Sequence, residues 1–460
     1  GENGANFYIR GISTISGVTS PLIVLDGMEI SSDDLNHLDP DVIESFSVLK
    51  DATATAMYGT RGANGVLIIT TKSGANLEKP IIGIRVESNV SVPTSVPKFA
   101  NGPEYMELYN EAVTNQGTGD VLYTKEQIDG TRKHLNPYIF PDVDWYKEIF
   151  KRSSFNEKAN FNIRGGSSRI VYFMNLNASH ESGMLRNRSK DYFSYNNGIN
   201  YTRYTFQNNI DFHMSKSSTI SLHLYAGLDD TDGPANNDID DIYNQVLAAN
   251  PVQYPISYPS NGDQWVHWGY YSLGNVAYTN PMAELTRGYS SNFASTINAN
   301  LDFEQKLDFI LKGLSFKAMF AFKNWSSSTT KRSQDFNTYQ LSKWSQDADG
   351  NYHFDAPPTG DPTKPVLSTS GSSSGDRDIY AQAYFDYNRT FGPHTIDAMA
   401  LWNIDEKNYN NVSDLLSSLP RRKMGFAGRL SYDYLHRYLV EFNAGYNGSE
   451  NFAKGHRWGF

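Results

Sequence analysis

The sequence predicts a mainly β protein in which a small α/β module precedes a large antiparallel sheet of the transmembrane β-barrel class. Apolar and polar residues alternate in segment after segment from about residue 80 to the end of the 460-residue chain. These segments match the roughly 9–11 residues that a tilted membrane-spanning strand needs. Short turns alternate with long connections, as they do between the two ends of such a barrel.

The chain up to residue 79 differs from the rest and predicts the α/β module. Residues 21–27 (PLIVLDG) and 65–71 (GVLIITT) are short apolar strands. Between them, residues 40–49 are expected to form a helix, with Asp39 as the N-cap and Pro40 at the first helical position. The residues expected on its buried face are Val42, Ile43, Phe46 and Leu49.

From residue 80 onward, each predicted strand has one apolar and one polar face. In residues 155–163 nearly every odd position is apolar and every even position is Asn or Lys. Such strands fit a sheet that faces lipid on one side and water on the other, and about ten or eleven of them are expected. The pattern recurs around residues 170–178, 220–226, 293–303, 314–322, 379–387 and 438–446.

The connections between these strands are of two kinds. Short hairpins are expected at residues 165–168, 391–394 and 435–437. Loops as long as the others are uncommon in compact soluble domains, whereas a barrel with tight periplasmic turns and extended outer loops requires them. The long loops are expected at about residues 99–150, 229–289 and 324–377.

Composition excludes several classes of protein. The formal net charge of −10 disfavours a nucleic-acid partner, which needs a basic surface. The chain has no cysteine, so it has neither disulfides nor thiolate metal sites. No stretch approaches the roughly 20 consecutive apolar residues of a transmembrane helix. The chain opens with GENG and no signal peptide, so a mature or trimmed product is expected.

An ordered set of motifs lies between residues 7 and 66. FYIRG at 7–11 is followed by PLIVLDG at 21–27, LDPDVIES at 38–45 and VLKDATATAMYGTRGANGV at 48–66. Together these motifs closely resemble the plug signature of SusC/RagA-like TonB-dependent outer-membrane transporters. The residues that carry the resemblance are Arg10, Gly11, Asp26, Gly27, Lys50, Asp51, Tyr58, Gly59, Arg61, Gly62, Asn64 and Gly65.

The resemblance implies a transmembrane antiparallel β-barrel of about 22 strands with a small α/β plug domain inside its lumen. Residues 1–79 would be the C-terminal part of the plug, and residues 80–460 the N-terminal part of the barrel, with about half of its strands. The family's N-terminal extension, its TonB box, the start of its plug and the rest of its barrel have no counterpart in this chain.

The resemblance also implies a setting and partners. The protein would be a multi-pass β-barrel in the lipid of the outer membrane of a Gram-negative bacterium. It would work with a SusD-like surface lipoprotein as a lid and with the TonB–ExbB–ExbD complex, and a dimer of SusC–SusD pairs is one expected assembly. No cofactor and no enzymatic activity are implied.

Three motifs resemble chemical sites, but their context favours other roles. The glycine-rich residues 59–65 precede a strand instead of opening a helix, so we expect a plug turn with Arg61 bonded to a carboxylate, not a phosphate cradle. GSSSG at 371–375 matches G-x-S-x-G, yet it lies in a Ser/Gly-rich loop. The acidic residues 229–241 lack EF-hand spacing, and a solvated loop is favoured over a cation site. The scattered histidines predict no metal site.

Aromatic side chains concentrate in two of the long connections. Sugars present C–H faces that pack on aromatic rings, so some of these residues are expected to contact an oligosaccharide. The alternative is that the rings pack the loops together or belong to an interfacial girdle. The candidate ligand-binding residues are Trp265, Trp268, Tyr270, Tyr271, Trp325 and Trp344.

Three functions follow from these patterns. The leading one is active import of oligosaccharides, the breakdown products of glycans, through the lumen. Peptide import of the RagA type is the second, and a β-rich glycan-binding adhesin without a transport role is the third. An enzyme is the weakest option, because no nucleophile, base and orienting group come together in the sequence.

Overall fold

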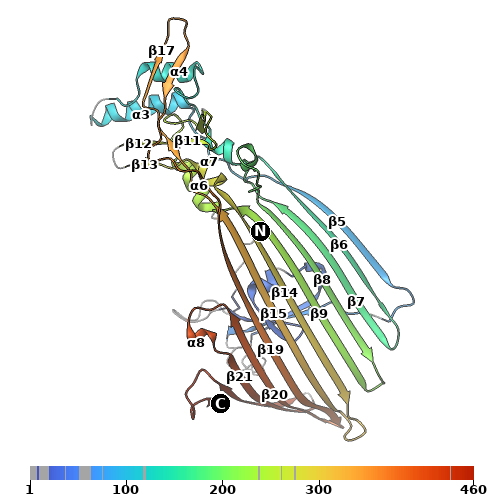
Figure 1. The fold of residues 1–460 in the computed structure, drawn as a ribbon. Coiled ribbons are helices and arrows are strands. Elements are labelled where there is room, and N and C mark those ends of the chain that lie inside the picture. Colours follow the sequence, from blue (N-terminus) through green and yellow to red (C-terminus); the bar gives the residue numbers. More distant parts are fainter. Residues whose placement is uncertain are drawn as a thin grey trace.

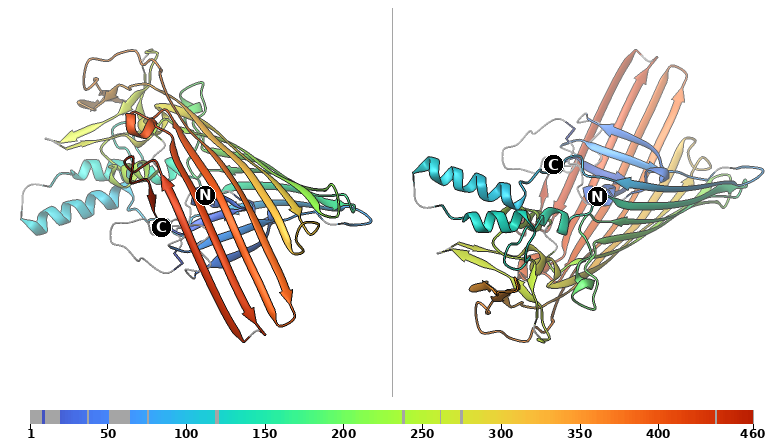
Figure 2. Two further views of the ribbon diagram at one scale, coloured as in Figure 1. Left: turned by 90° about the horizontal axis from the view of Figure 1, so that it is seen from below. Right: turned by 90° about the horizontal axis from the view of Figure 1, so that it is seen from above.

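The computed structural model describes residues 8–9, 20–36, 38–50, 64–74, 76–117, 121–236, 239–260, 262–273, 276–435 and 437–459. Its main feature is one curved antiparallel sheet of twelve strands, and a small four-stranded sheet lies against one face of it (Figures 1 and 2). We call the small sheet and its connections, residues 20–74, the N-terminal module. The face of the large sheet that meets this module is its inner face.

The N-terminal module has the strand order β2-β1-β4-β3, in which β1 runs parallel to β4. The apolar side chains of β1 and β4 form its core, as their unbroken apolar sequences predict. Its elements are β1 (Leu22–Leu25), β2 (Met28–Ile30), α1 (Ser32–Asn36), η1 (Pro40–Val42), β3 (Ile43–Leu49) and β4 (Val66–Thr71).

The expected helix over residues 40–49 is wrong beyond its first turn. Asp39 does cap a helix, accepting a bond from the Asp41 backbone N–H, but this 3₁₀ helix ends at Val42. Residues 43–49 instead form β3, which pairs antiparallel with β4. The free edge of β4 offers a full ladder of hydrogen bonds, and the β-branched and aromatic residues of IESFSVL favour that extended form.

The large sheet confirms the predicted mainly β, antiparallel architecture. Its edges are β5 and β23, and every strand except the two-residue β23 has at least eleven residues. Its strands are β5 (Ile81–Ser91), β6 (Ser154–Gly166), β7 (Ile170–Ser182), β8 (Asn200–His213), β9 (Ser218–Pro234), β14 (Gly288–Lys306), β15 (Leu314–Ser333), β19 (Ser368–Phe391), β20 (His394–Asn410), β21 (Arg421–Tyr434), β22 (Tyr438–Ser449) and β23 (Trp458–Gly459).

The two faces of the large sheet have opposite character. On the outer face, large apolar side chains such as Phe293, Phe320 and Leu430 remain about half exposed. The inner face is polar where it meets the module, and many of its amides are buried there. These buried polar residues are Asn160, Asn175, Asn177, Thr205, Gln207, Asn209, Asn298, Asn300 and Lys323.

Short and long connections lie at opposite ends of the large sheet (Figure 1). The three expected hairpins are confirmed by the pairings of β6 with β7, β19 with β20 and β21 with β22. Two of the expected long loops are shorter than predicted, because β9, β15 and β19 continue to Pro234, Ser333 and back to Ser368. These strand extensions consist mostly of Ser, Thr, Gly and charged residues, so apolar and polar residues do not alternate in them. The alternating pattern in the sequence therefore ends before the strands do.

The long connections pack together at one end of the large sheet, which we call the loop end (Figure 1). They form a core of their own, which includes Trp145, Tyr254 and Trp268. None of the helices in the described parts of the chain is long and apolar enough to cross a membrane. The elements of this end are α3 (Gly102–Gln116), α4 (Lys125–Arg132), α5 (Trp145–Ile149), η3 (Ser189–Asp191), α6 (Ile239–Ala248), β10 (Ser257–Tyr258), β11 (His267–Gly269), β12 (Tyr271–Leu273), β13 (Val276–Tyr278), α7 (Pro281–Thr286), β16 (Thr338–Tyr339), β17 (Lys343–Gln346), β18 (Tyr352–Asp355) and α8 (Leu415–Ser418).

Candidate functional site

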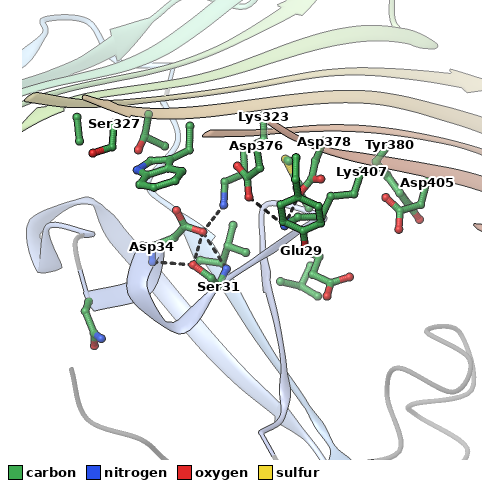
Figure 3. Close-up of a pocket in the computed structure, with 18 of the residues that line it drawn as sticks. Glu29, Ser31, Asp34, Lys323, Ser327, Asp376, Asp378, Tyr380, Asp405 and Lys407 are labelled. Atoms are coloured by element: carbon green, nitrogen blue, oxygen red, sulfur yellow. Dashed lines mark hydrogen bonds and ion pairs between the residues drawn. The ribbon is translucent and has the colours of Figure 1, made fainter. Parts of the chain in front are cut away.

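A charged cavity of about 820 Å³ separates the N-terminal module from the inner face of the large sheet. The module contributes the β1–β2 hairpin and α1 to its lining, and the sheet contributes side chains from β8 to β21 (Figure 3). Thr231, Asn292 and Ser327, which also line it, are a few residues from the loop ends of their strands. The cavity therefore lies on the side of the module that faces the long loops.

Strand register arranges the charged side chains of this cavity in rows. Because side chains alternate between faces, directly paired residues on neighbouring strands share a face. The central row runs Lys323, Asp378, Lys407, Arg421 across β15, β19, β20 and β21. The row nearer the loops runs Trp325, Asp376, Tyr409, and the row nearer the hairpins runs Tyr380, Asp405, Lys423.

Lys407 bridges the two carboxylates that β19 contributes to these rows. Its Nζ lies 3.1 Å from Asp376 Oδ2 and 3.3 Å from Asp378 Oδ2. The same ammonium lies 5.2 Å from the ring centre of Tyr409, and the guanidinium of Arg421 lies 5.1 Å from it. Tyr409 is thus an aromatic ring between two cations, in the distance range of cation–π contacts.

Lys323, which lines the cavity, connects the sheet to the module. It forms an ion pair with Asp34 of α1, and both side chains are largely buried (Figure 3). Burial alone would raise the pKa of Asp34, but the charge of Lys323 and hydrogen bonds from Lys323 and Ser31 together hold that pKa below its ordinary value. Asp34 is therefore a buried carboxylate that depends on Lys323.

Other polar bonds hold the module to the sheet. The Lys158 ammonium lies 3.2 Å from Asp39 Oδ2, and Arg85 pairs with Asp41 at 3.0 Å. Apolar contact adds to these bonds. Phe173 of β7 and Tyr225 of β9 pack into the core of the module, and Met28 contacts Met319 and Ala321. The joint therefore combines ion pairs with apolar packing.

The described part of the motif set shapes the β1–β2 turn. Asp26 and Gly27 both have positive φ, and the Asp26 carboxylate accepts bonds from the Thr71 backbone N–H at 2.9 Å and from its hydroxyl at 2.6 Å. A Cβ at Gly27 would lie 3.0 Å from Met319 Sδ, so glycine also permits the close approach to β15.

Lys50, Asn64 and Gly65 of the motif set lie at the ends of β3 and β4. The remaining members fall outside the described residues, and with them the expected bond of Arg61. These members are Arg10, Gly11, Asp51, Tyr58, Gly59, Arg61 and Gly62.

The candidate aromatic residues separate into four groups. Trp325 lines the charged cavity. Trp265 and Tyr270 gather around Tyr339, whose hydroxyl accepts a bond from Trp265 Nε1 at 2.9 Å and whose carbonyl accepts the Tyr270 backbone N–H. Trp268 is only 2% exposed and is part of the loop core, so the structure gives it a packing role.

The fourth group comprises the two remaining candidates, which contact other rings of the loops. Tyr271 lies against Tyr278, with ring centres 6.0 Å apart. Trp344 meets Phe140 edge to face at 5.4 Å. The loop aromatics are thus dispersed over several contacts and are not gathered in one cleft.

The other chemical motifs take structural positions. GSSSG at 371–375 is part of β19, not of a loop as expected, and it pairs residue by residue with β15. Asp229 is not a solvated loop residue but belongs to β9, where both its oxygens accept bonds from Arg203. Within the described ranges, no group of three His, Cys, Asp or Glu side chains is placed to hold a metal.

Sequence reasoning missed the charged rows. The signal was present in the i, i+2 spacing of Asp376 with Asp378, Asp405 with Lys407, and Arg421 with Lys423. That spacing places both members of each pair on one face of a strand. Which rows meet across strands depends on register, and register could not be derived from one strand alone.

Comparison with known proteins identifies relatives. The family model described as TonB-dependent Receptor Plug Domain matches residues 1–66. TonB-dependent receptor SusC of Bacteroides thetaiotaomicron is 26% identical over 99% of this chain and 44% of its own length. TonB-dependent receptor P3 of Formosa agariphila is 25% identical over 100% of this chain and 42% of its own length. The chain therefore spans less than half the length of these curated relatives.

Among solved structures, a chain of the RagAB peptide importer in its open-open state has a similar fold. Its TM-score is 0.69 at 20% sequence identity, and the match covers 98% of this chain and 51% of that one. The closed-closed state of the same importer matches with the same score and coverage.

Proposed function

We propose that this chain, which is part of a SusC-like TonB-dependent receptor, supplies the plug and barrel wall of an importer in the outer membrane of a Gram-negative bacterium. In this proposal, residues 1–79 are the C-terminal part of the plug and residues 80–460 are the N-terminal part of the barrel. The observation that carries the proposal is the opposite character of the two faces of the large sheet.

Lipid is the solvent that fits the outer face. Rings such as Phe320, Phe385 and Phe442 are about half or more exposed, and no second sheet covers them in the described parts of the chain. In water such a surface would aggregate, whereas against hydrocarbon it is favourable. The polar inner face then lines an aqueous lumen, and the N-terminal module obstructs it.

Oligosaccharides are the proposed substrates. The cavity above the module combines rings, which pack on sugar C–H faces, with carboxylates and ammonium groups, which bond hydroxyls. Trp325 and Tyr409 are the rings best placed for this role, and Asp405 and Lys423 neighbour each other across β20 and β21. Trp265, Tyr270, Tyr271 and Trp344 would act earlier, at the loops, with a SusD-like lipoprotein as the lid.

The position of the cavity would couple ligand binding to the arrangement of the module and the sheet. A ligand held there would contact the module and the sheet at the same time, so it would favour one arrangement of the two over another. The TonB–ExbB–ExbD complex would then supply the force that displaces the module. No catalytic step is needed in this scheme.

Peptide import is the second candidate, and the charged rows favour it. Alternating acidic and basic side chains, as in Lys323, Asp378 and Lys407, suit the termini and side chains of peptides. The fold similarity to the RagAB peptide importer agrees with this alternative without deciding it.

An uptake experiment with the full-length protein tests import. Cells that express it with its lid lipoprotein should accumulate labelled oligosaccharide, and deletion of TonB or of the plug's energy-coupling segment should abolish accumulation. Accumulation that is unchanged without TonB would overturn active import.

Native mass spectrometry of the purified complex distinguishes the two candidate substrate classes, since co-purified peptides would favour the second candidate. Extraction into buffer without detergent would instead indicate the adhesin.

A further inference from the structure

A second, much smaller cavity lies on the hairpin side of the N-terminal module. It has a volume of about 20 Å³ and is lined by the Asp26 turn of the module and by side chains of β8, β9 and β14. One water-sized occupant needs roughly 10–15 Å³, so the cavity has room for a single small ion or molecule.

Four amide oxygens around this cavity have no hydrogen-bond donor. They are Oε1 of Gln207 and Oδ1 of Asn209, Asn298 and Asn300. All four side chains are more than nine-tenths buried. Buried acceptors without partners carry a desolvation cost, so four around one cavity indicate a missing partner that accepts electron pairs.

The orientation of two of these amides is fixed by their own nitrogens. Asn209 Nδ2 donates to the Lys72 carbonyl at 2.7 Å and to Thr71 Oγ1 at 2.6 Å. Asn300 Nδ2 donates to the Asp26 carbonyl at 3.2 Å. Exchanging nitrogen and oxygen would set an oxygen against each carbonyl, so the free atoms of Asn209 and Asn300 are oxygens.

The surroundings of the cavity are negative. Asp26 lines it, and Asp302 is close enough to interact electrostatically with both Asp26 and Asp211. The nearest group able to carry positive charge is His223, whose Nδ1 lies 3.8 Å from Asp26 Oδ2 and has no hydrogen-bond partner. An electron-pair acceptor with positive charge therefore fits the site better than a neutral one.

We propose that a hard cation of the calcium type occupies this cavity and joins the N-terminal module to the large sheet. Calcium takes carboxylate, amide and backbone oxygens in flexible geometry, which is the chemistry that Asn209, Asn298, Asn300, Gln207 and Asp26 offer. One water would donate at most two hydrogen bonds and leave two of the four amide oxygens without a partner. The ion would bind the Asp26 turn to two strands, β8 and β14, at once.

Calcium titration of the full-length protein in detergent, after treatment with a chelator, tests the proposal. Added CaCl₂ should raise the melting temperature, and equilibrium dialysis should show one tightly held calcium per chain. Asn298→Leu should weaken calcium binding by at least about tenfold, as expected for loss of one group at a metal site. Asn298→Asp adds a negative ligand and should strengthen it.

Asn177→Leu is the matched control. Asn177 is another buried inner-face amide whose oxygen lacks a donor, but it does not line this cavity. Calcium affinity should be unchanged in that variant. The proposal is overturned if the unaltered protein neither binds calcium nor gains stability from it, or if both Leu variants lose calcium equally. The result does not depend on the transported substrate, so it is independent of the uptake experiment.

Discussion

Lys323 and Asp34 form the single most buried ion pair between the N-terminal module and the large sheet among the described residues. Neither side chain can be removed alone without leaving its partner charged and buried. We expect Lys323→Met to destabilise the full-length protein by about 3 kcal/mol, the usual cost of breaking a buried pair.

Thermal unfolding measures this loss, and a double-mutant cycle assigns it to the pair. The double variant Lys323→Met/Asp34→Leu should lose less stability than Lys323→Met alone, because no unpaired charge remains. Lys343→Met is the control, since Lys343 is 79% exposed in its pair with Asp355 and should contribute roughly 0–1 kcal/mol. Equal losses in the single and double variants would contradict the assigned role of the pair.

The same ion pair makes the stability of the folded protein depend on pH. The pKa of Asp34 is lowered from its ordinary 3.8 in the folded protein, so its stabilising effect is complete above that value and disappears as pH falls through the native pKa. The stability difference between the unaltered protein and Asp34→Asn should therefore be constant from pH 7 to about 4 and shrink at lower pH. A difference that shrinks between pH 7 and 5 would refute this account.

At this scale the sequence predicted little of the cavity. Trp325 was found because aromatic residues are conspicuous in a polar segment, whereas Lys323, Asp378 and Lys407 resemble ordinary charged strand residues until register brings them together. Trp268 met the same criterion as Trp325, yet it is in the loop core. Residue type alone does not distinguish a ring that packs from a ring that faces a cavity.

The strands could be predicted because apolar and polar residues alternate along each of them. This alternation arises because the two faces of the sheet lie in different environments. The hairpins could be predicted for the same reason, since each short polar turn lies between two segments in which apolar and polar residues alternate. The prediction failed where that signal was absent. β3 has helix-compatible apolar spacing and is held extended by its pairing with β4, and residues 368–377 of β19 alternate only among Ser, Gly, Thr and charged residues.

The outer face of β15 supplies a prediction for a single element. Phe320 lies on the outer face within the apolar run of that strand, from Leu314 to Phe322, where arginine would be in hydrocarbon. Phe320→Arg should lower the stability of the membrane-inserted protein by about 2–4 kcal/mol. Asn403→Arg, on the inner face of β20 two residues before Asp405, should change it by less than about 1 kcal/mol. Folding titrations into lipid vesicles measure both, and equal costs would contradict the assignment of the two faces.

For the whole molecule, the proposed function requires one sheet to separate two solvents. Its outer face would meet hydrocarbon and its inner face water, and the N-terminal module is held on the inner side by ion pairs and by apolar contact with Phe173 and Tyr225. Aromatic residues near the hairpin end, including Phe303, Phe316 and Phe385, cluster on the outer face as an interfacial girdle would. The class of fold followed from the sequence because this division of solvents repeats in every strand.

The most direct measurement of that division is a cysteine scan along β15 in the membrane-inserted, full-length protein. These 460 residues contain no cysteine, so each thiol introduced among them reports on one position. Labels at Phe316, Ala318, Phe320 and Phe322 should be quenched by brominated lipid and protected from a water-soluble maleimide. Labels at Lys317, Met319, Ala321 and Lys323 should escape lipid quenching. Quenching without a two-residue period, or on neither face, would contradict the account.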